Sequence, residues 1–243
     1  MNDDIRNIVL GLVAAGISGT LGWLARTARW RRRLARMQDF FGLPANSQAL
    51  LVVNRQAGQD GGVRRFDVFA LLELSGLIKD CGAQMQVVWH DGAHQGVGEQ
   101  TEFCVGGPVS NRRVEAHLRI LLPGVRIDTE GVGPHLNAYR IGSQVYGADR
   151  GTEEYALLAR VTPHGQERPV FLLCGQRSIN NQAAARYLAR HHGELARAHG
   201  KDSFCLLLRV VNSDAYGPDV VELVADVTTA ARTAPVAAAD GSG

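Results

Sequence analysis

The sequence predicts an α/β fold: a Rossmann-like, mostly parallel sheet with antiparallel additions, preceded by one N-terminal transmembrane helix. Three observations predict it. Apolar runs of strand length alternate with segments of helical periodicity, short alternating runs interrupt this pattern mid-chain, and an uncharged stretch lies near the N-terminus. We divide the chain into an anchor (1–26), a basic juxtamembrane segment (27–48), the α/β domain (49–228) and a disordered tail (229–243).

The first segment is interpreted as a membrane anchor. From Ile8 to Ala25 no residue is charged for 18 positions, which gives a helix about 27 Å long, near the thickness of bilayer hydrocarbon. Six arginines follow from Arg26 to Arg36, and such a flank stays cytoplasmic. We therefore expect a single-pass protein of the cell inner (plasma) membrane, with a cytoplasmic globular domain and arginines that contact anionic lipid. A cleaved signal peptide is the alternative, although the start MNDDIR carries two acids and one arginine.

Small residues recur within this anchor. Gly11, Ala15 and Gly19 are spaced four apart, so they form one stripe of a helix, and such stripes let two membrane helices approach closely. A homodimer through this stripe is one interpretation. The other is that glycine is simply common in membrane helices.

Charge and cysteine usage narrow the function classes. The first 36 residues hold seven arginines and two aspartates, which leaves 19 basic and 22 acidic residues in the rest of the chain. A net acidic domain offers no basic footprint, so we expect no nucleic-acid partner. The four cysteines lack CxxC spacing, which predicts buried thiols in a reducing compartment and no metal site.

The remaining elements follow in order. Residues 33–48 predict a short helix that ends near Gly42 and Pro44. Continuous apolar runs at 49–54, 85–91, 102–105 and 168–175 predict parallel strands with both faces covered. Amphipathic segments at 63–82, 112–124 and 176–200 predict the connecting helices. Short alternating runs at 125–163 predict antiparallel strands, and 203–211 and 220–228 predict two last strands.

Two turns in this pattern resemble each other. FCVGGPVSN (103–111) and FLLCGQRSINN (171–181) each run from a strand through glycine to serine and asparagine at the start of a helix. Such turns can hold an anionic or polar ligand beyond the carboxyl edge of the sheet, which makes Gly106, Gly107, Ser110, Asn111, Gly175, Ser178 and Asn180 candidate ligand-binding residues. The serines and asparagines can equally be N-caps of their helices.

Other strand ends should collect at the same edge. Asn54 ends the first strand and His90 ends the second, and both join the candidate ligand-binding set. A rim rich in amides and hydroxyls suits a nucleotide or a phosphorylated sugar. Candidate catalytic acids are Asp91, Asp149 and Glu154, but no motif names a reaction, so whether the chain is an enzyme stays open.

A membrane helix followed by a small Rossmann-like domain with the motif VGGPVSN resembles the SLOG-like and TIR-like nucleotide-binding or nucleotide-processing domains of bacterial conflict and signalling systems. The resemblance implies a nucleotide ligand and a sensor or effector role in signalling or defence. The catalytic glutamate arrangement of the TIR-like enzymes is not identifiable in this chain. Three functions therefore remain: a membrane-anchored binding module, a hydrolase of an N-glycosidic or phosphoester bond of a nucleotide, and a membrane-tethered protein-interaction scaffold.

Overall fold

A computed structural model describes residues 2–54, 62–92 and 98–235, without the side chains of residues 2–6, 8–9 and 11–18. The long first helix is α1 (Asn2–Phe41). The other helices are α2 (Arg65–Asp80), α3 (Arg112–Leu121), α4 (Ser178–His199), α5 (Ser213–Tyr216), α6 (Thr228–Arg232) and the 3₁₀ turn Gly133–His135. The strands are β1 (Gln48–Val53), β2 (Gln84–Trp89), β3 (Thr101–Val105), β4 (Val125–Asp128), β5 (Ala138–Ile141), β6 (Gln144–Tyr146), β7 (Glu153–Val161), β8 (Val170–Gly175), β9 (Phe204–Val211) and β10 (Val221–Asp226).

The main sheet has seven strands in the order β10-β9-β7-β8-β3-β1-β2. Strands β2, β1, β3 and β8 pair in parallel, while β7 is antiparallel to both of its neighbours and β10 is antiparallel to β9. Strands β4, β5 and β6 form a separate antiparallel sheet of three strands. The predicted α/β fold, with a mostly parallel sheet and antiparallel additions, is confirmed.

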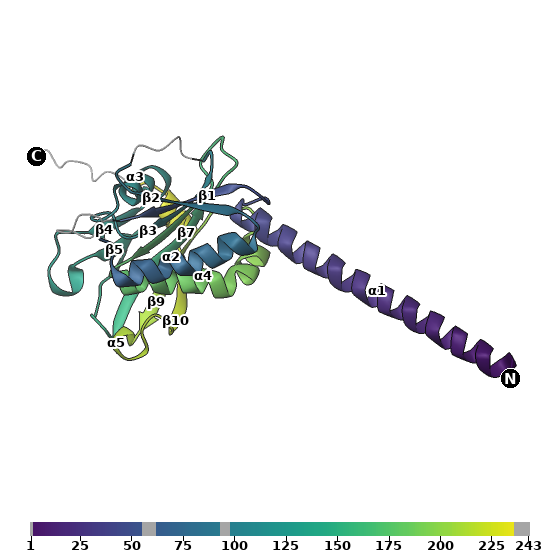
Figure 1. Cartoon of the computed structure of the whole chain (residues 1–243). Helices are drawn as coiled ribbons and strands as arrows, with labels where there is room; N and C mark the ends of the chain where they lie inside the picture. Colours follow the sequence, from purple (N-terminus) through teal and green to yellow (C-terminus); the bar gives the residue numbers. More distant parts are fainter. Residues whose placement is uncertain (1, 55–61, 93–97, 236–243) are drawn as a thin grey trace, which may run out of the picture.

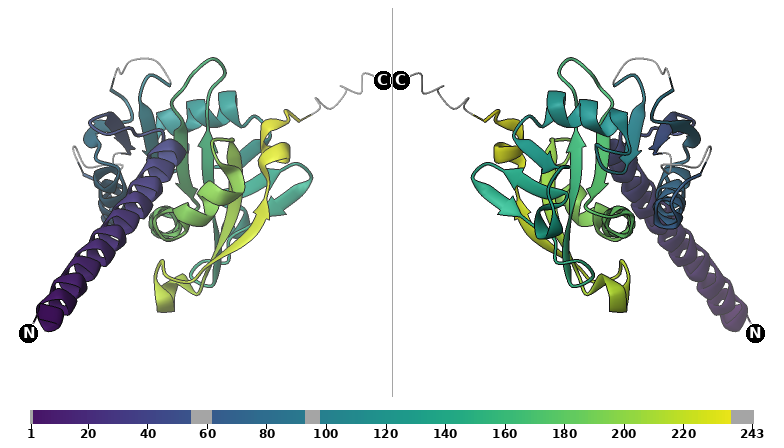
Figure 2. Two further views of the ribbon diagram at one scale, coloured as in Figure 1. Left: turned by 90° about the vertical axis from the view of Figure 1, so that its right-hand side faces the viewer. Right: turned by 90° about the vertical axis from the view of Figure 1, so that its left-hand side faces the viewer.

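Each face of the main sheet carries its own core. Phe103 and Phe171 lie side by side in register, with ring centroids 4.8 Å apart, on the face that α2 and α4 cover. Their neighbours Cys104 and Leu172 belong to the other face, where α3, α6 and the small sheet pack. This alternation follows from the two-residue period of a strand, and it explains why strands buried on both faces are apolar throughout (Figure 2).

The N-terminal helix differs from the predicted arrangement. Instead of an anchor and a separate short helix, α1 is one helix that extends away from the domain in Figure 1 and ends at Phe41. Its last turn belongs to the core, because Phe40, Phe41 and Leu43 are fully buried. Gly42 ends the helix with φ of +63°, as the glycine predicted. Buried Arg160 donates a hydrogen bond of 2.8 Å to the carbonyl of Phe40 and fixes this end.

The structure does not support the predicted membrane span. Among the residues that the structure describes, none of the helices has a stretch long and apolar enough to cross a membrane. Most of the span, including Gly11 and Ala15 of the small-residue stripe, lies outside the residues whose side chains are described. Gly19, the third member of the stripe, is described, and a β-carbon there would meet no other atom within 4 Å.

The connections place a crevice at the carboxyl ends of the central strands. The chain leaves β1 through α2 and returns in β2 at the sheet edge, whereas it leaves β3 through α3 on the opposite face and later adds β8 on the other side of β3. The two connections diverge where β1 and β3 are neighbours. Ligands of open α/β sheets bind at this kind of position.

Candidate functional site

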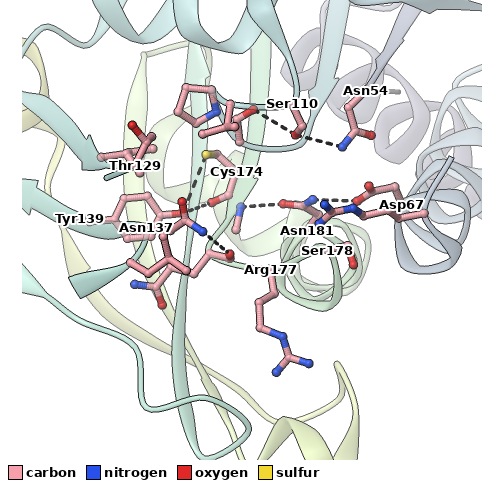
Figure 3. Close-up of a pocket in the computed structure, with 18 residues that line it drawn as sticks. Asn54, Asp67, Ser110, Thr129, Asn137, Tyr139, Cys174, Arg177, Ser178 and Asn181 are labelled. Atoms are coloured by element: carbon pink, nitrogen blue, oxygen red, sulfur yellow. Dashed lines mark hydrogen bonds between the residues drawn. The ribbon is translucent and has the colours of Figure 1, made fainter. Parts of the chain in front are cut away.

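A cavity of about 220 Å³ occupies this position (Figure 3). It is lined by residues that directly follow three parallel strands: Asn54 after β1, Gly107 and Ser110 after β3, and Gln176 to Ser178 after β8. Asp67 and Asn181 reach it from α2 and α4, and Asn137 and Tyr139 from the small sheet and its approach. The structure therefore brings both of the resembling turns into one cavity.

The first turn needs its glycine for two reasons. Gly106 has φ of +115°, which L side chains rarely adopt, and a β-carbon on it would lie 3.1 Å from Asn54 Nδ2. Gly107 faces the second turn, since its β-carbon would lie 3.9 Å from the carbonyl oxygen of Gly175. Ser110 Oγ accepts from Asn54 Nδ2 at 3.1 Å. Close backbone approach is what joins the two turns.

Asn111 acts as the cap of α3. Its Oδ1 accepts from the backbone N–H groups of Arg113 and Val114 at 3.0 and 3.1 Å, and its Nδ2 donates to Val105 at 2.9 Å. The next free N–H of the turn, on Arg112, donates to His90 Nδ1 at 3.3 Å. The N–H groups of Arg112, Arg113 and Val114 at the start of α3 are therefore hydrogen-bonded within the protein, and the N-cap alternative is confirmed for Asn111.

The second turn is built differently. Gly175 is held so closely that a β-carbon on it would lie 2.6 Å from Asn180 Cβ, and its N–H donates to Asn181 Oδ1 at 2.6 Å. Asn180 Oδ1 accepts from the N–H of Arg177 at 2.8 Å. Arg177 is the N-cap residue and makes no side-chain capping bond. The first N–H groups of α4, at Ser178 and Ile179, have no intrahelical acceptor, and Ser178 lines the cavity.

Asp67 is a site residue that the sequence prediction missed. It lies in the first turn of α2, is 0% exposed, lines the cavity, and accepts through Oδ1 from Asn181 Nδ2 at 2.7 Å. Burial raises its pKa, against the opposing effects of the Asn181 and Asn54 amides and the charge of Arg64. The signal in the sequence was its position: Asp67 shares the buried stripe of α2 with Ala70 and Leu74, so an acid stands where an apolar residue is expected.

Two polar atoms of the cavity are left over. Asp67 Oδ2 and Asn54 Oδ1 are buried and have no hydrogen-bond partner among the described residues. The Asn54 amide lies close enough to favour the charged form of Asp67, but no hydrogen bond of ordinary distance and angle joins the two side chains. Buried acceptors without donors are uncommon in folded proteins.

Glu154, a predicted catalytic candidate, holds structure beside the cavity and does not line it. It is fully buried and accepts from Arg177 at 2.8 Å, from Asn180 at 3.1 Å and from Ser213 at 2.7 Å. Burial raises the pKa of Glu154, but the three hydrogen bonds and the charge of Arg177 outweigh it and hold the pKa below its usual value. The carboxylate is fully engaged in fixing the start of α4.

The other two predicted acids lie away from the cavity wall. Asp91 is exposed in the turn after β2, and Asp149 is exposed in the turn before β7, where its backbone bridges to Glu153. His90 is half-buried and reaches the start of α3. Of the predicted ligand-binding residues, five line the cavity, Asn54, Gly107, Ser110, Gly175 and Ser178, while Gly106, Asn111, Asn180 and His90 support the turns from behind.

A second buried polar cluster is an ion-pair network. Glu102, Cys104 and His117 lie close enough together to be considered as metal ligands. However, Arg113 donates to both carboxylate oxygens of Glu102, and His117 Nε2 lies 3.1 Å from Oε2. Burial raises the pKa of Glu102, but the hydrogen bonds from His117 and Arg113 outweigh this effect and hold the pKa below its usual value. The Arg113 guanidinium already neutralises the charge of this carboxylate, which makes the cluster an ion pair.

Comparisons with known proteins add no family. No protein-family model matches the chain, and no curated protein sequence is significantly similar to it.

Proposed function

We propose that the chain is a membrane-anchored domain that binds a nucleotide-like or phosphorylated small molecule in the cavity between the two turns, as a sensor or effector in signalling or defence. The observation that carries the proposal is the open N-terminus of α4. Its first N–H groups point out of a helix of 22 residues, next to a cavity at the carboxyl ends of parallel strands. Backbone donors and the positive end of a helix dipole favour a phosphate at this position.

The contrast between the two turns supports this reading. The turn before α3 has its donors occupied by Asn111 and His90, whereas in the turn before α4 the Asn180 side chain accepts from the N–H of Arg177, which precedes the first N–H groups of the helix. Arg177 and Arg64 also line the cavity and add positive charge at its wall. Arg177 is held by Glu154 at 2.8 Å with its side chain 32% exposed, so its guanidinium is positioned and remains accessible.

The membrane part of the proposal rests on α1. A helix of 40 residues is about 60 Å long, and its arginine-rich part lies between the uncharged stretch Ile8 to Ala25 and the buried Phe40 and Phe41. In this arrangement Arg26 to Arg36 contact anionic lipid, and the domain is cytoplasmic. The helix continues into the core without a linker, because Phe40 and Phe41 are buried there.

Pairing of the anchors provides a test of this part. Replacing Gly11, Ala15 and Gly19 with leucine keeps the segment apolar and removes close helix approach. Cross-linking of the full chain in membranes should then fall sharply. An unchanged yield of cross-linked dimer would mean that the stripe is not an interface.

A ligand screen tests the central proposal. The full chain in detergent micelles is heated with inorganic phosphate, ribose 5-phosphate, AMP, GMP, CMP, UMP and ADP-ribose, each at several concentrations. A ligand at 100 times its dissociation constant stabilises the folded state by about 2.7 kcal/mol, which is a readily measured rise in melting temperature. The absence of a rise with every compound would refute the proposal.

A hydrolase is the second candidate, and Asp67 is the observation that favours it. Asp67 is the acidic residue among those that line the cavity, and burial raises its pKa, as a general acid requires. This function predicts that the wild-type chain releases base or phosphate from one of the screened nucleotides and that Asp67→Asn does not. If a nucleotide binds and no product is released, the hydrolase function is excluded and the sensor function remains.

A further inference from the structure

The inner wall of the cavity presents two hydrogen-bond acceptors that nothing in the described protein satisfies. Asp67 Oδ2 and Asn54 Oδ1 are both buried without a donor, in side chains that are 0% and 3% exposed. Figure 3 shows the two side chains next to each other on the same side of the cavity, at the carboxyl end of β1 and the start of α2. Leaving acceptors buried and unpaired destabilises a fold, so the arrangement indicates a partner that arrives with the ligand.

The other atoms of these side chains are already in use and fix their orientation. Asp67 Oδ1 is bound by Asn181, whose own Oδ1 holds the N–H of Gly175, and Asn54 Nδ2 donates to Ser110. The Asp67 carboxylate therefore cannot rotate without breaking its contact with Asn181, and the Asn54 side chain is held in place by Ser110. Their acceptor lone pairs are positioned before any ligand binds.

Resting on the proposed function, we propose that this acceptor pair binds the vicinal hydroxyl groups of a ribose, with one hydroxyl donating to Asp67 Oδ2 and the other to Asn54 Oδ1. The phosphate of the same ligand then lies at the N-terminus of α4, whose first turn also carries Asn181, the partner of Asp67. Carboxylate recognition of ribose hydroxyls is a chemically strong interaction, because a charged acceptor makes the stronger hydrogen bond.

Hydroxyl groups fit this wall better than amines. The Ser110 hydroxyl donates to the carbonyl of Gly107, and the Asn54 amide uses one of its two N–H hydrogens on Ser110 Oγ, so the second can donate to a ligand oxygen. A hydroxyl donates and accepts at once, whereas an ammonium group only donates. Burial also raises the pKa of Asp67. Both the protonated and the ionised carboxyl can form a hydrogen bond with a hydroxyl group.

A divalent cation fits less well than a diol. Magnesium sites use one or two carboxylates together with substrate phosphates. Here the charge of Arg64 already favours the charged form of Asp67, and Arg177 lines the cavity with its guanidinium paired to Glu154. The extra charge of a cation would be unfavourable, while a neutral diol adds none.

The size of the cavity agrees with a pentose and its phosphate. Its volume of about 220 Å³ lies below the range of about 300–1,000 Å³ that encloses a drug-sized ligand. The lining residues Val109 and Leu136 are 74% and 48% exposed, and they offer an apolar surface at the cavity mouth. A base attached to the ribose would lie against this surface, outside the enclosed part.

The first test compares sugars. AMP, GMP, CMP and UMP are each titrated into the full chain by calorimetry against the matching 2′,3′-dideoxynucleoside monophosphate, in the presence and absence of EDTA. We expect each bound ribonucleotide to bind at least tenfold more tightly than its dideoxy form, with no effect of EDTA. Equal affinity of the two forms would overturn the diol proposal and leave the proposed function standing. Loss of binding in EDTA would overturn it in favour of a metal. No binding of any nucleotide, together with no thermal shift by phosphate or ribose 5-phosphate, would refute the proposed function itself.

The second test separates binding from folding. Asp67→Asn keeps the side-chain shape and removes the carboxylate, and Glu73→Gln is its control, because Glu73 lies on the same helix and pairs with Arg186 at 2.8 Å outside the cavity. We expect Asp67→Asn to weaken ribonucleotide binding at least tenfold, leave dideoxynucleotide binding unchanged, and keep or raise the melting temperature. Asn54→Ala should weaken only ribonucleotide binding in the same way. A lower melting temperature of Asp67→Asn, with equal losses for both sugars, would mean that Asp67 is structural.

Discussion

Glu154→Ala gives the sharpest separation between a catalytic and a structural acid. The wild-type carboxylate is fully buried and accepts hydrogen bonds from Arg177, Asn180 and Ser213. Removing it leaves one charged and two neutral donors beside an empty space. We expect this substitution to unfold the start of α4, and with it the wall of the cavity that α4 forms.

The expected loss follows from those three contacts. Breaking a buried ion pair by removing one partner costs about 3–5 kcal/mol. The side chain of Arg177 is 32% exposed and can regain water, so the loss should lie near the lower limit, about 3 kcal/mol. For a domain of this size that corresponds to a fall in melting temperature of roughly 6–12 °C. Glu154→Gln keeps one acceptor and should cost about 1–3 kcal/mol.

Urea unfolding of the full chain, followed by circular dichroism, measures these losses. The matched control is the neighbouring Glu153→Gln, whose ion pair with Arg209 spans 3.4 Å with the glutamate 45% exposed and should contribute less than about 1 kcal/mol. If Glu154→Ala unfolds within about 1 kcal/mol of the wild type yet loses ligand binding or turnover, the structural assignment of Glu154 is wrong.

Three further outcomes are expected. Phe41→Ala should destabilise the domain by about 3–5 kcal/mol in urea, because the ring is fully buried in the core; a loss below about 1 kcal/mol would mean that α1 is not part of the fold. Glu102 has a pKa below its usual 4.5 because its hydrogen bonds outweigh burial. Its contribution to the free energy of unfolding is therefore present above pH 4.5 and is lost as the pH falls through the folded-state pKa. The difference in stability between wild type and Glu102→Gln should shrink on acidification, and a constant difference contradicts this. The buried Cys174 has a pKa raised to about 12, so a thiol reagent at mildly alkaline pH should label it only as fast as the chain unfolds; immediate labelling would contradict its burial.

The parallel half of the fold could be predicted because its strands carry a local signal. Runs such as those around Leu51, Phe103 and Phe171 are apolar on both faces, and the amphipathic helices between them leave few alternatives. The place of β7 between β8 and β9 could not be predicted, since its neighbours are set by long-range pairing. Phe40 and Phe41 looked like part of a juxtamembrane segment, because nothing in their own sequence shows that the core lies beside them.

The candidate site was predictable only as far as composition reaches. The turns at Gly107 and Gly175 could be predicted from a glycine after a buried strand, and the structure places these two turns side by side. The sequence did not show which helix start is open, because both turns carry serine and asparagine. Asn111 accepts from the N–H groups of Arg113 and Val114, whereas Asn180 accepts from that of Arg177. Asp67 was missed since an acid in the first turn of a helix is also the ordinary partner of the helix dipole.

The most direct test of the central claim is to fill the cavity and measure binding. Gly107 lines it, has no positive φ, and a β-carbon there would meet only Gly175 O at 3.9 Å, so Gly107→Leu can be accommodated while it occupies the ligand space. Gly76→Leu on the exposed side of α2, with nothing within 4 Å, is the control. The nucleotide that gives the largest thermal shift is titrated into all three proteins by calorimetry. The account predicts binding to the wild type and to Gly76→Leu with equal affinity, and at least tenfold weaker binding to a folded Gly107→Leu; equal affinity of all three proteins would contradict it.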